Sequence, residues 1–80
     1  MLFVMTMLIR LDSMKKVKEF VDIASHYAGK IKVSSGKYTV NGKSIMGLFS
    51  LELRDDLSLE IEPGKELSDL IQELEPYVVA

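Results

Sequence analysis

The chain has 80 residues, with ten basic against twelve acidic side chains and a formal net charge of −2. This length predicts one domain, residues 1–80, that buries only about 60–65% of the surface exposed on unfolding, which argues against a deep enzymatic cleft. Because the chain has no cysteine, neither disulfides nor a thiolate metal site can stabilise it. The nearly balanced charge gives no electrostatic footprint for nucleic acid.

The apolar run at residues 1–9 is predicted to be a strand. No basic residue precedes it and no small-residue cleavage site follows it, so it does not have the pattern of a secretory signal. It is also far shorter than the roughly 20 apolar residues that a membrane helix needs. We therefore expect a cytoplasmic protein without a membrane segment, with Met5 and Met7 as alternative initiation residues.

Helical spacing of apolar residues follows this strand. Asp12 and Ser13 can cap a helix, which should begin between Asp12 and Lys15 and end at Gly29. Its apolar stripe consists of Val17, Phe20, Val21, Ala24 and Ala28, flanked by Ile23 and Tyr27. The pattern then changes to a period of two over residues 30–33 and 37–40, which predicts a hairpin with its turn at residues 34–36.

The second half of the chain opens with a turn dipeptide, Asn41-Gly42. Ser44 is the expected N-cap of a short helix that extends through Leu51 and is weakened by Gly47. Alternation over residues 57–62 is the clearest strand pattern in the sequence. The last helix should end near Glu75, before Pro76, and its apolar face contains Leu67, Leu70, Ile71 and Leu74.

This order of elements predicts an α+β fold, in which a four-stranded antiparallel sheet is covered on one face by three helices. The helices are too few to cover both faces. The other face of the sheet is expected to be polar, where opposite charges on neighbouring strands could pair. The charged residues expected there are Lys30, Lys32, Lys37, Glu60 and Glu62.

The sequence contains little catalytic chemistry. His26 is the only histidine, so no histidine pair or histidine–cysteine set can form a metal site or a nucleophile–base couple. Its position near the end of the first helix suits a capping role, in which it complements the helix dipole. No glycine-rich phosphate loop is present. We therefore expect a protein that is not an enzyme and that needs no metal or other cofactor.

One segment, residues 41–51, reads Asn-Gly-Lys-Ser-Ile-Met-Gly-Leu-Phe-Ser-Leu. It resembles the stretch that identifies HPr proteins, the small phosphocarriers of the bacterial sugar phosphotransferase system. The resemblance continues through Phe20-Val21, Ala24-Ser25 and Ile31, and the βαββαβα order matches the open-faced sandwich of that family over essentially the whole chain. In this family a serine at the start of the short helix is phosphorylated by a dedicated kinase, which implies Ser44 as the phosphorylation site.

The physical character of this segment also suggests partner binding. Its apolar residues cannot all face the core from one short helix, so some of them must face solvent or a partner. We predict a partner-binding surface made by Lys43, Ile45, Met46 and Leu48. The alternative is that Leu48, Phe49 and Leu51 fill the edge of the core. We favour this alternative for Leu51 and the binding role for Ile45 and Met46.

The chain departs from the family at the start of the first helix. HPr proteins carry the phosphoryl-accepting histidine there, followed by an arginine and a proline, whereas residues 11–18 read Leu-Asp-Ser-Met-Lys-Lys-Val-Lys and are about three residues shorter. Histidine relay is therefore expected to be lost. The lysines there, Lys15, Lys16 and Lys18, are either a solvated basic face or a surface for an anion or acidic partner.

The resemblance implies a regulatory protein similar to the catabolite-repression branch of the family, which also lacks the histidine. Its expected partners are HPr kinase/phosphorylase, a transcriptional regulator of carbon catabolism and enzymes of the phosphotransferase system. Two alternatives remain open: a divergent phosphocarrier-like component of a sugar phosphotransferase system, and a docking module that is never phosphorylated.

Overall fold

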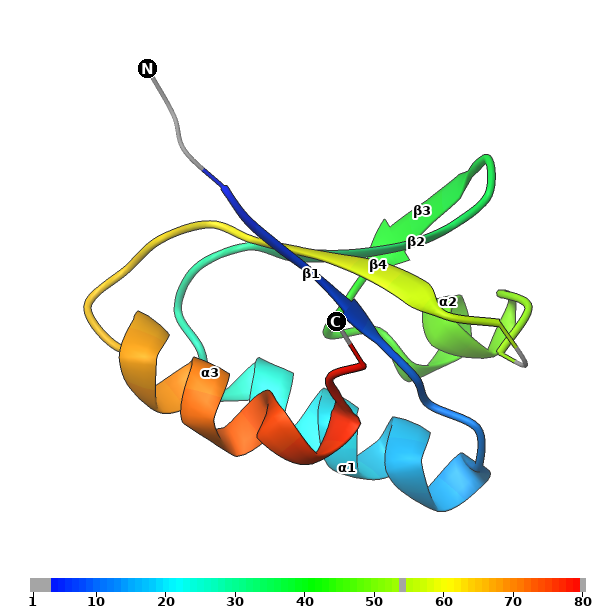
Figure 1. The fold of residues 1–80 in the computed structure, drawn as a ribbon, viewed down its shortest axis with the longest axis horizontal. Coiled ribbons are helices and arrows are strands. Elements are labelled where there is room, and N and C mark those ends of the chain that lie inside the picture. Colours follow the sequence, from blue (N-terminus) through cyan, green and yellow to red (C-terminus); the bar gives the residue numbers. More distant parts are fainter. Residues whose placement is uncertain (1–3, 54, 80) are drawn as a thin grey trace.

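The computed structural model describes residues 4–53 and 55–79, so residues 1–3 of the predicted first strand lie outside the described part. The helices and strands follow the predicted order βαββαβα (Figure 1). The elements are β1 (Met5–Ile9), α1 (Met14–Ser25), β2 (Ile31–Ser35), β3 (Tyr38–Asn41), α2 (Ile45–Phe49), β4 (Leu57–Ile61), α3 (Leu67–Leu74) and the short 3₁₀ helix η1 (Glu75–Tyr77).

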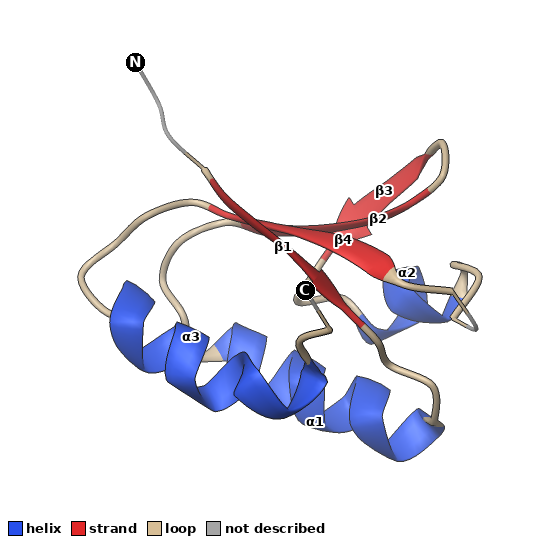
Figure 2. Ribbon diagram, viewed as in Figure 1, coloured by secondary structure: helices blue, strands red, loops and turns tan. Residues whose placement is uncertain are grey.

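The four strands form one antiparallel sheet in the order β1-β4-β2-β3. All three α-helices lie on one side of this sheet, and the other side is open (Figure 2). This arrangement confirms the predicted fold class. No helix among the described residues is long and apolar enough to cross a membrane.

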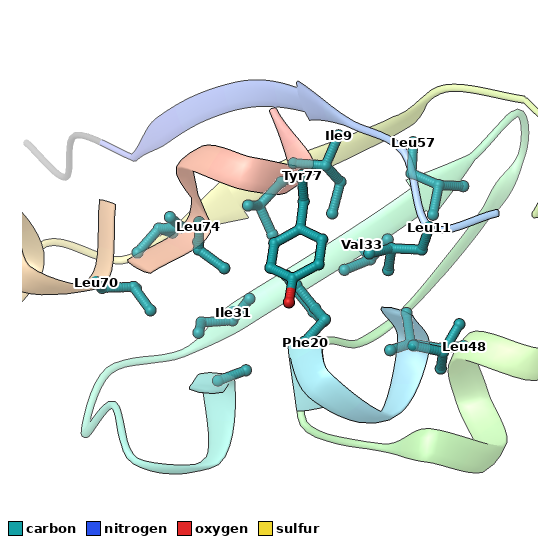
Figure 3. Packing of buried hydrophobic residues seen from close by; sticks show 14 of the residues in the cluster. Ile9, Leu11, Phe20, Ile31, Val33, Leu48, Leu57, Leu70, Leu74 and Tyr77 are labelled. Atoms are coloured by element: carbon teal, nitrogen blue, oxygen red, sulfur yellow. The ribbon is translucent and has the colours of Figure 1, made fainter. Parts of the chain in front are cut away.

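The core lies between the helices and the covered face of the sheet (Figure 3). Inward-facing residues of β4 alternate with partly exposed ones, so that the strand buries Leu57, Leu59 and Ile61. From the predicted helical faces, the structure fully or nearly fully buries Val17, Phe20, Ala24, Leu70 and Leu74. Val21, Leu67 and Ile71 are half-buried.

Helix α1 begins within the predicted interval and ends earlier than predicted. Ser13 is its N-cap, with Oγ accepting a hydrogen bond from the Lys16 N–H at 3.2 Å. The helix ends at Ser25, not at Gly29, and Ala28 is exposed outside it. The cause is Tyr27, which leaves the helix, buries its ring and donates from its hydroxyl to the Glu62 carbonyl at 2.6 Å.

The hairpin also differs from its prediction. Ser34 and Ser35 belong to β2, and the turn consists of Gly36 and Lys37, with Gly36 at a φ of 59°. Glycine adopts this left-handed φ without steric cost, which explains why the turn is centred there. Lys37 is therefore a turn residue and not a strand residue of the open face. Tyr38 is 72% exposed, because the tip of this hairpin extends beyond the helices (Figure 1).

The C-terminal segment attaches to the outer edge of β1. The Arg10 N–H donates to the Tyr77 carbonyl and the Val79 N–H donates to the Leu8 carbonyl, each at 2.9 Å. The ring of Tyr77 crosses the core towards α1 (Figure 3), where its hydroxyl donates to the Glu19 carboxylate at 3.0 Å. These contacts connect the end of the chain to both layers of the fold.

Candidate functional site

The turn that precedes α2 is held tightly against β2. The Asn41 side chain accepts from the Lys43 N–H at 2.9 Å, and the Gly42 N–H donates to the Ile31 carbonyl at 2.8 Å. A Cβ added at Gly42 would lie 2.5 Å from Cγ2 of Ile31. The glycine is therefore required because the chain passes so close to the strand, and this approach fixes the position of Ser44.

Ser44 is the N-cap of α2, as predicted. Its Oγ accepts from the Gly47 N–H at 3.1 Å, and its side chain is half-buried. Gly47 lies where a Cβ would be 3.1 Å from Cβ of Val40 and 3.3 Å from the Ser44 Oγ. The glycine of the motif thus lets α2 lie against β3 without disturbing the cap.

Lys43 is half-buried and is anchored to the end of α1, since its ammonium group donates to the Tyr27 carbonyl. Burial, followed by the nearby Glu62 and Glu66 carboxylates, raises the pKa of the Tyr27 hydroxyl. Through its hydrogen bond to the Tyr27 carbonyl, Lys43 joins the turn before α2 to the segment after α1. The sequence, which places Lys43 only beside Ser44, does not predict this contact.

The apolar residues of α2 divide into two groups. Met46 is 78% exposed and Phe49 is 40% exposed, whereas Ile45 is half-buried against the core. Leu48 is fully buried and lies among the core side chains (Figure 3). Assigning Leu48 to the partner-binding surface was therefore wrong, because a five-residue helix lying on the sheet must turn one side chain inward. Leu51 is buried, as we favoured.

Phe49 is the residue that the sequence analysis missed on this surface. It follows Leu48 directly, so once Leu48 faces the core the next side chain must point about 100° away around the helix. The exposed part of α2 consists of Met46 and Phe49, separated by nearly one turn.

The start of α1 is more exposed than the start of α2. Ser13, Lys15 and Lys18 are exposed. Lys16 forms an ion pair with Asp12 at 3.0 Å, and this ammonium group lowers the pKa of the Asp12 carboxyl. The lysine cluster therefore contains an internal counter-charge, which favours a solvated basic face over an anion site.

His26 lies at the other end of α1, as its C-cap. Its side chain is exposed, and Nδ1 donates to the Asp22 carbonyl at 2.7 Å. This arrangement matches the predicted capping role. His26 also lines an open hollow between α1 and α3, together with Glu66, Asp69 and Glu73. Among the described residues, no group of histidine and carboxylate side chains is arranged to hold a metal ion.

Comparison with known proteins gives a consistent result. A family profile described as the PTS HPr component phosphorylation site matches residues 14–79. A comparison with curated protein sequences gives no match. Among solved structures, HPr-C-His from Thermoanaerobacter tengcongensis is 28% identical, with a TM-score of 0.73 over 92% of this chain and 88% of that chain.

Two further solved structures support the fold. The phosphocarrier protein HPr from Bacillus anthracis strain Ames is 23% identical, with a TM-score of 0.75 over 95% of this chain and 98% of that chain. The histidine-containing phosphocarrier protein of a mycoplasma is 15% identical, with a TM-score of 0.69 over 92% and 89%. The profile covers most of the chain, from the first residue of α1 through the whole of α2 and the last helix, and the chain therefore belongs to the HPr family of the phosphotransferase system.

Proposed function

We propose that this chain is a regulatory HPr homologue, one domain of residues 1–80, that acts through phosphorylation of Ser44 and has lost histidine relay. The observation that carries the proposal is the contrast between two positions. The family motif at α2 is intact and its serine caps the helix. The only histidine lies at the C-cap of α1, at the opposite end of that helix from the family's acceptor position.

A phosphate on Ser44 would change the surface without requiring the core to rearrange. It would add about −1.5 to −2 charges beside the exposed Met46 side chain. The Lys43 ammonium group is held by the Tyr27 carbonyl, so it could approach the phosphate only by exchanging that hydrogen bond. The added charge would therefore remain largely available to a partner, which suits recognition of the modified form.

The partners that fit this proposal are HPr kinase/phosphorylase, which would modify Ser44, and a transcriptional regulator of carbon catabolism, which would bind the product. Met46 and Phe49 are the apolar side chains that such partners could contact, since exposed methionine adapts to different surfaces. Enzymes of the phosphotransferase system would use the same side chains.

The test uses HPr kinase, ATP and the intact mass of the product. Wild type should gain one phosphate and Ser44→Ala should gain none. Ser13→Ala is the matched control, because Ser13 is also a serine N-cap whose Oγ accepts from the N–H three residues ahead. Labelling of Ser44→Ala, or no labelling of wild type under conditions that modify an ordinary HPr, would contradict the proposal.

Loss of histidine relay is tested separately with phosphoenolpyruvate and the first enzyme of the system. No acid-labile phosphate should form on wild type. A phosphohistidine that disappears in His26→Gln would show that the chain is a divergent phosphocarrier instead. If neither treatment modifies the protein, the exposed Met46 and Phe49 favour the third function, a docking module that is not phosphorylated.

A further inference from the structure

A second candidate site lies away from both helix starts. A hollow of about 380 Å³ is found where the loop after α1 passes the end of the β2–β3 hairpin. Its polar lining includes Lys30, Lys32, Lys43 and Asn41, and its apolar lining includes Ile31 and Val40. Small-molecule sites have volumes from about 300 to 1,000 Å³ and combine apolar walls with a few polar groups. This hollow lies at the lower end of that range.

The charge of this hollow is one-sided. Three lysines line it and no carboxylate does, among the residues that the structure describes. The protein as a whole carries a net charge of −2, and the hollow between α1 and α3 contains three carboxylates. Positive and negative groups are therefore separated between the two hollows, and only the hollow beside β2 and β3 has a charge suited to an anion.

One of the three ammonium groups is already positioned. Lys43 is half-buried, and its Nζ donates to the Tyr27 carbonyl, so its position is fixed before any ligand arrives. An ammonium group has three donors, which leaves capacity for a ligand beside that bond. The side-chain Oδ1 of Asn41 accepts from the Lys43 N–H within the turn. The side-chain NH₂ group of Asn41 takes no part in this hydrogen bond.

Lys32, on the exposed side of β2, and the exposed Lys30, which directly precedes this strand, supply the other two charges. Two carboxylates lie next to these lysines: Glu60 is the register partner of Lys32 on β4, and the Glu62 N–H donates to the Lys30 carbonyl at 2.9 Å. Both reduce the positive potential there, but neither lines the hollow, whose own lining contains three ammonium groups.

We propose that this hollow binds a small organic phosphate monoester. Lysine binds phosphate as a point charge, and three ammonium groups exceed the charge of one phosphate dianion. The half-buried Val40 supplies the apolar surface for the organic part of the ligand, because the Ile31 side chain is buried in the core. The lysines surround one compact hollow instead of following the length of β3, which favours a small ligand over an extended acidic peptide. The proposal does not depend on phosphorylation of Ser44.

The test is a titration with glycerol 2-phosphate followed by backbone amide chemical shifts, at constant ionic strength set with sodium chloride. Saturable shifts confined to residues 28–32 and 39–43 are expected, with a dissociation constant in the millimolar range. Inorganic phosphate should bind at least about threefold more weakly, because it lacks the organic part. Equal or tighter binding of inorganic phosphate would overturn the assignment of an organic ligand.

Three exposed lysines provide the variants and the control. Lys30→Gln and Lys32→Gln should each weaken binding by about three- to tenfold. Lys37→Gln is the matched control, since Lys37 lies in the turn at the far end of the same hairpin and does not line the hollow, and it should change binding by less than about twofold. Glu60→Gln removes the opposing charge and should tighten binding by up to about threefold.

Two results would overturn the proposal. The first is a linear, unsaturated shift that spreads over all lysines and is reduced equally by Lys37→Gln, which would indicate only general screening. The second is binding of an octaglutamate peptide at these amides when glycerol 2-phosphate causes no shift, which would assign the hollow to an acidic protein partner.

Discussion

The starts of α1 and α2 use the same local structure in different surroundings. Each begins with a serine whose Oγ accepts from the N–H three residues ahead, Ser13 at 3.2 Å and Ser44 at 3.1 Å. Around Ser13 the neighbours are exposed lysines and one exposed ion pair. Around Ser44 the turn is held against β2 and Lys43 is tied to Tyr27.

The two serine caps are alike, so any difference in how partners bind these helix starts must come from the surrounding residues. The start of α1 has the same helix geometry but is surrounded by exposed charges. The start of α2 holds Ser44 in position, because the turn before it is hydrogen-bonded to β2 and Leu48 beneath it is buried in the core. A partner that binds α2 has little ordering entropy to overcome, which is the condition for specific recognition.

The largest expected effect tests whether α2 is anchored by the core. Leu48→Ala should destabilise the protein by about 2–5 kcal/mol, because Leu48 is fully buried. Met46→Ala, in the same helix and exposed, should change stability by less than about 0.5 kcal/mol. Urea unfolding followed by circular dichroism measures both, and similar losses in the two variants would show that α2 is not divided into a buried and an exposed side.

The second prediction compares the two caps directly. Ser44→Ala and Ser13→Ala should each cost about 0.5–2 kcal/mol, with Ser44→Ala nearer the upper end because its side chain is half-buried. Equilibrium unfolding of the two variants under one set of conditions is the measurement. A greater loss of stability in Ser13→Ala than in Ser44→Ala would contradict this expectation.

The third prediction concerns Tyr27, to which Lys43 is tied. Tyr27→Phe removes the hydroxyl that donates to the Glu62 carbonyl and should cost about 0.5–1.5 kcal/mol at neutral pH. Tyr77→Phe is the matched control, because its hydroxyl binds the Glu19 side chain and not the backbone. Amide hydrogen exchange at residues 42–44 tests whether Tyr27 stabilises the turn before α2. Faster exchange there only in Tyr27→Phe would support this coupling, and an equal increase in both variants would contradict it.

The same tyrosine predicts a response to alkaline pH. Burial raises the pKa of Tyr27 in the folded state above its ordinary value, so the folded state favours the neutral phenol. Its contribution to stability is fully present below the unfolded pKa of about 10 and is lost as pH rises through the folded pKa. The difference in stability between wild type and Tyr27→Phe should therefore shrink at high pH, and a difference that grows there would contradict the sign.

The smallest effect concerns the ion pair at the start of α1. Lys16 lowers the pKa of Asp12, so the contribution of this pair is present above the unfolded pKa of about 4 and is lost as pH falls through the folded value. Lys16→Gln should raise the pKa of Asp12, as measured by carboxyl carbon shifts, with little change in thermal stability at pH 7 because both side chains are exposed. Lys15→Gln is the control and should leave that pKa closer to the wild-type value.

The sequence predicted the features of the fold that depend on neighbouring residues. Both serine caps and the alternation in β4 follow from side chains close to one another in the chain. The end of α1 was predicted wrongly, because Tyr27 leaves the helix to reach Glu62, which is 35 residues away. The tip of the hairpin was predicted wrongly, because the turn uses the left-handed Gly36 as its first residue and therefore begins two residues later than the serine pair suggested.

The candidate site was predictable to a lesser degree. The motif located Ser44, but the burial of Leu48 and the exposure of Phe49 depend on how α2 lies on the sheet. The hollow lined by three lysines combines residues from the α1–β2 loop, both strands of the hairpin and the following turn. Lys43 comes together with Lys30 and Lys32 only in the tertiary fold, and no local sequence pattern connects it with them.

The neighbours of β1 also determine when the protein can fold during synthesis. β1 leaves the ribosome long before β4, with which it pairs from Met5 opposite Ile61 onward, and its outer edge is completed by residues 77–79. A nascent chain that ends before residue 57 therefore displays the inward side of β1 with no strand to pair it. Because β1 is held by β4 and by residues 77–79, the sheet can be completed only after residue 79 has left the ribosome, and removal of residues 77–79 should weaken β1 although it is far away in sequence.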